Sequence, residues 1–96
     1  MGNNADELRG ENPEMGARMR LIRESAGLTQ TAFAILIGTT AQSVSGYENG
    51  NGVPWQVAVR IVEAMPWLTT DYIYRGTLGS PEMARKLGLP GWGSGR

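Results

Sequence analysis

The sequence contains neither cysteine nor histidine. Without cysteine there can be no disulfide framework and no thiolate metal site, and without histidine the commonest metal ligand and general base are missing. The acidic residues that remain, Glu24, Glu48, Glu63 and Asp71 among them, show no catalytic spacing. We therefore expect a protein that is not an enzyme and that holds no metal and no cofactor.

Long hydrophobic runs are also missing. No stretch reaches the roughly 18 apolar residues that a membrane-spanning helix needs. The N-terminal residues lack the apolar segment of a secretory signal and the Arg-rich, acid-poor character of an organelle-targeting peptide. We expect a cytoplasmic protein without membrane contact, and its 96 residues correspond to one small domain.

The chain has no excess of positive charge, because nine Lys and Arg residues balance nine Asp and Glu residues. A nucleic-acid-binding protein usually carries such an excess. The charges are unevenly distributed, however: residues 1–15 have four acidic side chains and one Arg, whereas residues 16–75 have five Arg and four acidic side chains. The neutral total therefore leaves nucleic-acid binding open.

What the sequence does contain is apolar residues at helical spacing, separated by capping residues and glycines. This pattern predicts an all-α fold, a compact five-helix bundle with helices near 13–26, 29–37, 40–48, 54–65 and 70–75 and no strand. The expected buried residues are Met19, Ile22, Phe33, Ala34, Ile37, Val44, Tyr47, Ile61 and Ile73.

Three regions follow from this pattern. Residues 1–12 are polar and are predicted to form a disordered acidic arm, and residues 13–76 form the folded domain. Residues 77–96 form a C-terminal extension, in which Ser80 and Pro81 allow a short helix ending before Gly88. The remaining C-terminal residues are expected to be flexible.

The helices at 29–37 and 40–48 are joined by a turn at Gly38, an arrangement typical of a helix-turn-helix, whose second helix enters the major groove of DNA. The matching positions are Leu28-Thr29-Gln30, Phe33-Ala34, Ile37-Gly38-Thr39-Thr40, Ser43-Val44 and Tyr47-Glu48-Asn49-Gly50, followed by Pro54, Asp71-Tyr72-Ile73 and Gly76. Over residues 15–76 the chain resembles the Cro/CI-type, or XRE, family of lambda-repressor-like helix-turn-helix regulators.

The resemblance implies sequence-specific binding of double-stranded operator DNA by a homodimer that acts as a transcriptional regulator, a phage- or prophage-type repressor. It implies that Gln30 contacts a phosphate, in agreement with the preference of helix N-termini for anions, and that the helix at 40–48 reads bases. Gln42 has a side chain that can pair with adenine in the major groove. The candidate DNA-binding residues are Thr29, Gln30, Thr40, Ala41, Gln42, Ser43, Ser45, Gly46, Asn49 and Asn51.

Arg23 and Glu48 match a pair that forms a structural ion pair in the family. Other positions depart from the family pattern. Ala41 and Gly46 replace long base-reading side chains, and the loop at 49–53 has no Lys or Arg, so we expect modest base readout and weak binding.

Ile35 and Leu36 stand where the family usually has polar, exposed residues. Two adjacent exposed apolar side chains could mark a surface for a protein partner. Alternatively, the helix is rotated or the C-terminal segment covers it. The neutral charge and this apolar pair support a second hypothesis for the function: a protein-interaction module, such as an antitoxin or a helix-turn-helix fold that has lost DNA binding.

Overall fold

The computed structural model describes residues 11–89. Within this range six helices and no strand are present, so the all-α prediction is confirmed. The helices are α2 (Pro13–Ser25), α3 (Gln30–Ile37), α4 (Ala41–Glu48), α5 (Trp55–Ala64), α6 (Thr70–Arg75) and α7 (Pro81–Leu87). Of the arm predicted to be disordered over residues 1–12, residues 1–10 lie outside the described residues, as do the C-terminal residues 90–96. The predicted arm is too long at Asn12, whose N–H donates to the Gly50 carbonyl at 3.0 Å.

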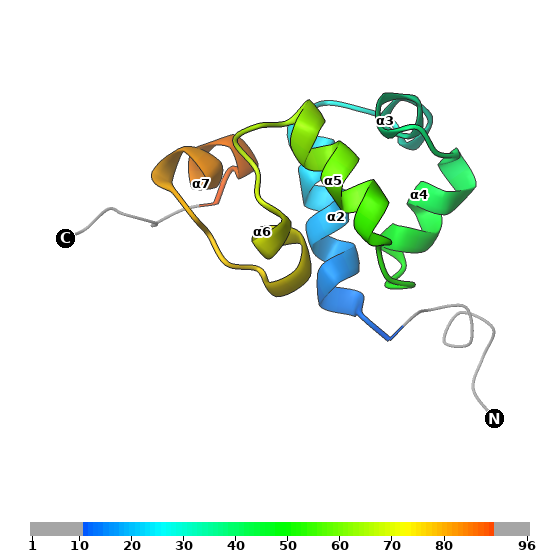
Figure 1. Ribbon diagram of the computed structural model, residues 1–96, viewed down its shortest axis with the longest axis horizontal. Helices are drawn as coiled ribbons and strands as arrows, with labels where there is room; N and C mark the ends of the chain where they lie inside the picture. The colour runs from blue at the N-terminus through cyan, green and yellow to red at the C-terminus, as the bar shows by residue number, and fades with distance from the viewer. Residues whose placement is uncertain (1–10, 90–96) are drawn as a thin grey trace.

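The helix α2 runs through the middle of the molecule, with α3 and α4 on one side and α6 and α7 on the other (Figure 1). The helix ends follow the capping residues in the sequence. Thr29, Thr40, Thr69 and Ser80 each accept a hydrogen bond from a backbone N–H three residues ahead. Asn12 is at the N-cap of α2 but its side chain makes no capping hydrogen bond.

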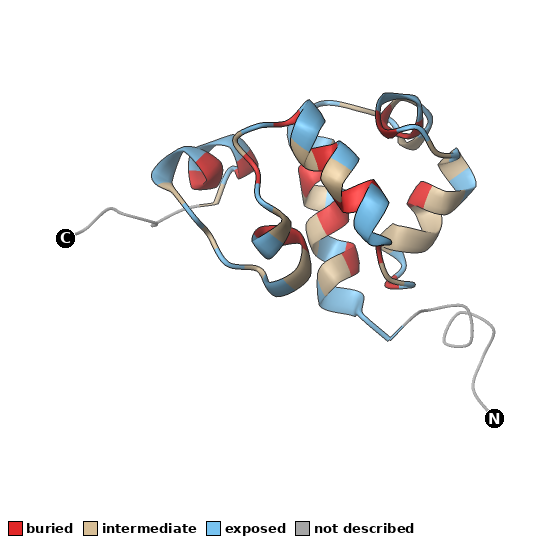
Figure 2. Ribbon diagram, viewed as in Figure 1, coloured by how far each residue is buried: buried red, intermediate tan, exposed pale blue. Residues whose placement is uncertain are grey.

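The core is built from the inward faces of these six helices, whose buried residues are red in Figure 2. The predicted core residues are buried, with the exception of Tyr47. Tyr47 packs against the core but stays half-buried, because the end of α4 on which it lies borders a groove at the surface.

The five-helix prediction is too low, because α7 is a regular helix that belongs to the packed bundle. Pro81 occupies its first turn and Gly88 ends it in the left-handed conformation. Its residues Met83 and Leu87 are buried in the same core as Ile61 and Ile73. The packed unit therefore extends beyond residue 76, where the sequence pattern places the end of the domain.

None of the helices between residues 11 and 89 is both long enough and apolar enough to cross a membrane.

Candidate nucleic-acid interface

The helix-turn-helix unit is α3, a short turn and α4. Gly38 ends α3 with φ 74°, a left-handed conformation that favours glycine, and this allows the chain to change direction over the three residues 38–40 before α4. Thr40 then begins α4 by accepting a hydrogen bond from the Ser43 N–H at 3.0 Å. α4 also packs on α2, so its orientation is fixed on two sides.

α4 buries only Val44 completely; Gln42 is exposed and the other residues of the helix are half-buried. A groove runs beside α4 and along the loop that follows it. It is lined by Thr40, Gln42, Ser43, Gly46, Tyr47, Asn51, Gly52 and Pro54. Gln42 and Asn51 are exposed here and carry amide donors and acceptors. The groove therefore brings together Thr40, Gln42, Ser43, Gly46 and Asn51 of the predicted site, all of them uncharged.

Two of these side chains are engaged with the protein itself. The Thr40 hydroxyl donates a hydrogen bond to Ser43 Oγ at 3.0 Å, which leaves the Ser43 hydroxyl proton available. At Gly46, an added Cβ would lie 3.2 Å from the side-chain amide nitrogen of Asn51. The loop folds back onto α4 here, since the Asn51 backbone N–H donates to the Gly46 carbonyl at 3.0 Å.

The other predicted residues lie outside this groove. Ala41 and Ser45 are half-buried on α4. Thr29 caps α3, where its hydroxyl oxygen accepts from the Ala32 N–H at 3.1 Å. Asn49 is exposed and lines a second groove, between α2 and the end of α4.

Gln30, for which the family resemblance implies a phosphate contact, makes a hydrogen bond within the protein. Its amide donates to Glu48 Oε1 at 3.1 Å. A glutamine amide carries two N–H groups, so one remains for another acceptor. Gln30 is therefore part of the network that holds α3 to the end of α4.

The centre of that network is Glu48, whose side chain is only 1% exposed. Arg23 donates to both carboxylate oxygens, from Nε to Oε2 at 2.5 Å and from Nη2 to Oε1 at 3.2 Å. Arg23 also donates from Nη1 to the Leu28 carbonyl at 2.8 Å, which ties the turn before α3 into the same cluster. Arg23 and Glu48 therefore form the structural ion pair that the family resemblance implies.

The environment of Glu48 acts on its pKa in two directions. Burial disfavours the charged carboxylate and raises the pKa, whereas the hydrogen bonds from Arg23 and Gln30 and the Arg23 charge lower it. The balance leaves the pKa of Glu48 below its ordinary value. The hydrogen bond to Glu48 correspondingly raises the pKa of Arg23.

Sequence patterns gave no signal for several residues that support the site. Gly16 on α2 faces the end of α4, where an added Cβ would clash with the Glu48 carbonyl and would lie 2.9 Å from the Gly50 nitrogen. The Tyr74 hydroxyl donates to the Val53 carbonyl at 2.7 Å, and its ring stacks on Trp55 with centroids 6.1 Å apart. These contacts connect residues far apart in the sequence and fix both ends of the loop after α4.

Ile35 and Leu36 project from α3 with 77% and 49% of their surfaces exposed. The described part of the C-terminal segment packs elsewhere, because α7 lies against α2. Among the described residues, therefore, the alternative that this segment covers the pair is wrong.

No three acidic side chains within residues 11–89 come together as metal ligands.

Comparison with known proteins gave one family match. The family model described as helix-turn-helix domain matches residues 14–65, from the first turn of α2 to the end of α5, which is more than half of the chain. Neither the search of curated proteins nor the search of solved structures gave a match. The matched segment contains α3, the Gly38 turn and α4 in the order described above, and the chain belongs to the helix-turn-helix domain family.

Proposed function

We propose that this protein binds double-stranded DNA sequence-specifically, through α4, as a transcriptional regulator. The observation that carries the proposal is the uncharged polar groove beside α4, with Gln42 exposed in it, within a helix-turn-helix unit. Gln42, Ser43 and Asn51 offer hydrogen-bond donors and acceptors along one groove. Side chains of this kind read base edges, whereas backbone and cationic groups position the protein on phosphates.

More specifically, we propose that the protein is a phage- or prophage-type repressor of the Cro/CI type and that it acts as a homodimer. One helix reads only a few base pairs, and two-fold related helices reach half-sites about one helical turn apart. Occupation of such a site would block access to a promoter. The proposal assigns no catalytic step and no cofactor to the protein.

In vitro selection from a random duplex library tests this function. We expect enrichment of a short motif with two related half-sites, and protection of about that length in a footprint. Light scattering of the complex should give two chains per duplex. If low-salt selection enriches nothing over the starting library, the DNA-binding proposal fails.

A second candidate function is favoured by α3. Its eight residues carry no charged side chain, and Ile35 and Leu36 are exposed. An apolar helix face of this kind suits a protein partner. A variant with Ile35→Gln and Leu36→Gln separates the two functions: it should bind selected DNA as the wild type does, whereas an interaction module would lose its complex.

A further inference from the structure

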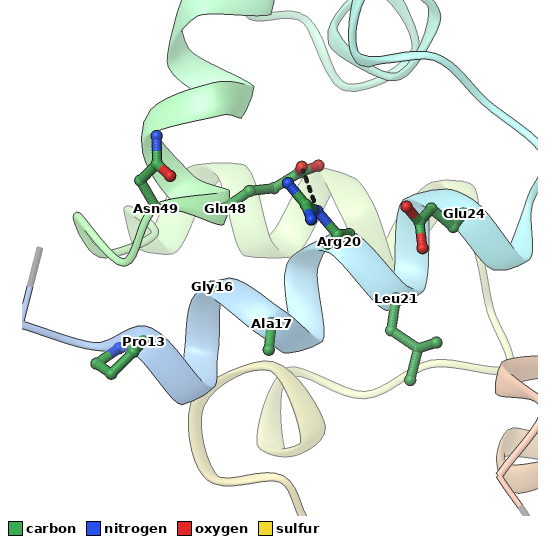
Figure 3. A pocket seen from close by; sticks show the side chains of 8 residues that line it. All are labelled: Pro13, Gly16, Ala17, Arg20, Leu21, Glu24, Glu48 and Asn49. Carbon is green, nitrogen blue, oxygen red and sulfur yellow. Dashed lines mark hydrogen bonds and ion pairs between the residues drawn. The ribbon is translucent and has the colours of Figure 1, made fainter. Parts of the chain in front are cut away.

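A surface groove runs along the seam where α2 meets the end of α4, on the side that carries the Glu48 cluster. Figure 3 shows the residues that line it, which are Pro13, Gly16, Ala17, Arg20, Leu21, Glu24, Glu48 and Asn49. Arg20 is the one cationic residue in this lining. Asn49 comes directly after α4, so the groove borders the helix to which base reading is assigned.

Arg20 is the more exposed of the two arginines that contact Glu48, and its contact is the longer one. Its Nε lies 3.5 Å from Glu48 Oε1, at the limit of a hydrogen bond, and its side chain is 60% exposed. The Glu48 carboxylate already accepts two hydrogen bonds from Arg23 and one from Gln30. The charge of Glu48 is therefore compensated without Arg20. Among the described residues the terminal Nη groups of Arg20 have no hydrogen-bond partner.

An exposed guanidinium with unused donors is suited to bind a phosphate, which it can contact through two N–H groups at once. The Asn49 side chain offers a neutral donor in the same groove. Glu24, one helical turn further along α2, is 57% exposed and repels an anion at its end of the groove (Figure 3).

On this basis we propose that Arg20, with Asn49, binds a backbone phosphate of duplex DNA in this groove. This inference rests on the proposed function. Arg20 would supply a positive charge for phosphate binding, which the loop at 49–53 lacks because it contains no Lys or Arg. In the free protein Arg20 stays near Glu48, and in the complex its Nη groups turn to the phosphate while Arg23 and Gln30 keep Glu48 in place.

The salt dependence of binding to a scrambled duplex tests the site, because the log–log slope counts phosphates neutralised by cations. Arg20→Gln should lower the magnitude of the slope by about 0.9, the value for one phosphate. Arg20→Lys keeps the charge and should keep the wild-type slope. Arg85→Gln removes one charge from an exposed position on α7, on the opposite side of α2 from α4 (Figure 1), and should leave the slope unchanged.

Two further variants test the geometry of the site. Asn49→Ala should weaken binding to selected and scrambled duplexes equally without changing the slope, because Asn49 is neutral. Glu24→Gln should strengthen binding to both. The melting temperature of Arg20→Gln should stay within about 3 °C of the wild type, since Glu48 keeps its other partners.

Equal slopes for wild type, Arg20→Gln and Arg85→Gln would overturn the phosphate site while leaving DNA binding itself intact. Loss of the fold in Arg20→Gln would also overturn it, because it would make Arg20 a structural partner of Glu48. A wild-type protein that binds no duplex contradicts the proposed function instead.

Discussion

Arg23 on α2 binds both carboxylate oxygens of Glu48 at the end of α4, at 2.5 and 3.2 Å. The two residues are 25 positions apart, and their contact ties α2 to the proposed DNA-reading helix α4. The Arg23 side chain is 13% exposed and the Glu48 side chain 1% exposed, so water does little to replace a lost partner.

Removing the carboxylate of this pair should destabilise the fold. Glu48→Ala should lower the free energy of unfolding by about 3–5 kcal/mol, because it leaves the partly buried Arg23 guanidinium without its counter-charge. Glu63→Ala removes an exposed carboxylate on α5 and should change it by less than about 0.5 kcal/mol. Denaturant titration of both variants measures the difference. Equal losses would show that the pair contributes nothing specific to stability.

The lowered pKa of Glu48 predicts how stability depends on pH. A carboxyl group with a lower pKa in the folded state stabilises the fold above its unfolded-state pKa, and this contribution is lost as pH falls through the folded pKa. The loss should therefore begin near the ordinary value of 4.5 and continue below it. Glu48→Gln cannot titrate, so its stability should fall less steeply on acidification below that pH. Parallel curves for the two proteins would contradict this assignment.

Gly16 tests the close approach of α2 and α4. Gly16→Ala places a methyl group against the Glu48 carbonyl and 2.9 Å from the Gly50 nitrogen, where only backbone atoms could move aside. We expect a loss of about 1–3 kcal/mol from overpacking, although alanine is the better helix former. Ala17→Ser, at the neighbouring exposed position, is the control and should be nearly neutral. A Gly16→Ala protein of higher stability would show that the helices do not pack this closely.

The contribution of α7 to the core is testable in the same way. Met83→Ala should cost about 2–5 kcal/mol, because the Met83 side chain is 1% exposed and its removal leaves a cavity. Lys86→Ala on the exposed face of α7 should have little effect. If Met83→Ala melts like the wild type, α7 is a detached extension and the packed unit ends near residue 76.

Local sequence signals were sufficient for most of the fold. Apolar spacing with a capping threonine and a terminal glycine predicted α3 and α4 to within one residue, because these signals act within a single helical turn. The same signals placed α7 but said nothing about the burial of Met83 and Leu87. Burial depends on which surface the helix meets, and this surface belongs to α2, about 60 residues earlier in the chain.

The candidate site was predictable only in part. The residues of α4 follow from the motif, and the Arg23 and Glu48 pair follows from the family resemblance. The hydrogen bond from Gln30 to Glu48 and the position of Arg20 beside the same carboxylate do not. Three helices converge on Glu48, and no pattern within one helix encodes that convergence.

The most direct test of the central claim is the binding of Gln42→Ala to two duplexes, the selected motif and a scrambled sequence of equal length. Gln42 is exposed on α4 and is proposed to contact a base edge. The substitution should therefore weaken binding to the selected duplex by about 1–3 kcal/mol and leave binding to the scrambled duplex nearly unchanged. Gln30→Ala should weaken both by similar factors, because the second N–H of its amide is proposed to contact a phosphate, which every duplex has. If Gln42→Ala binds both duplexes as the wild type does, α4 does not read bases through Gln42, and base recognition by this helix is contradicted.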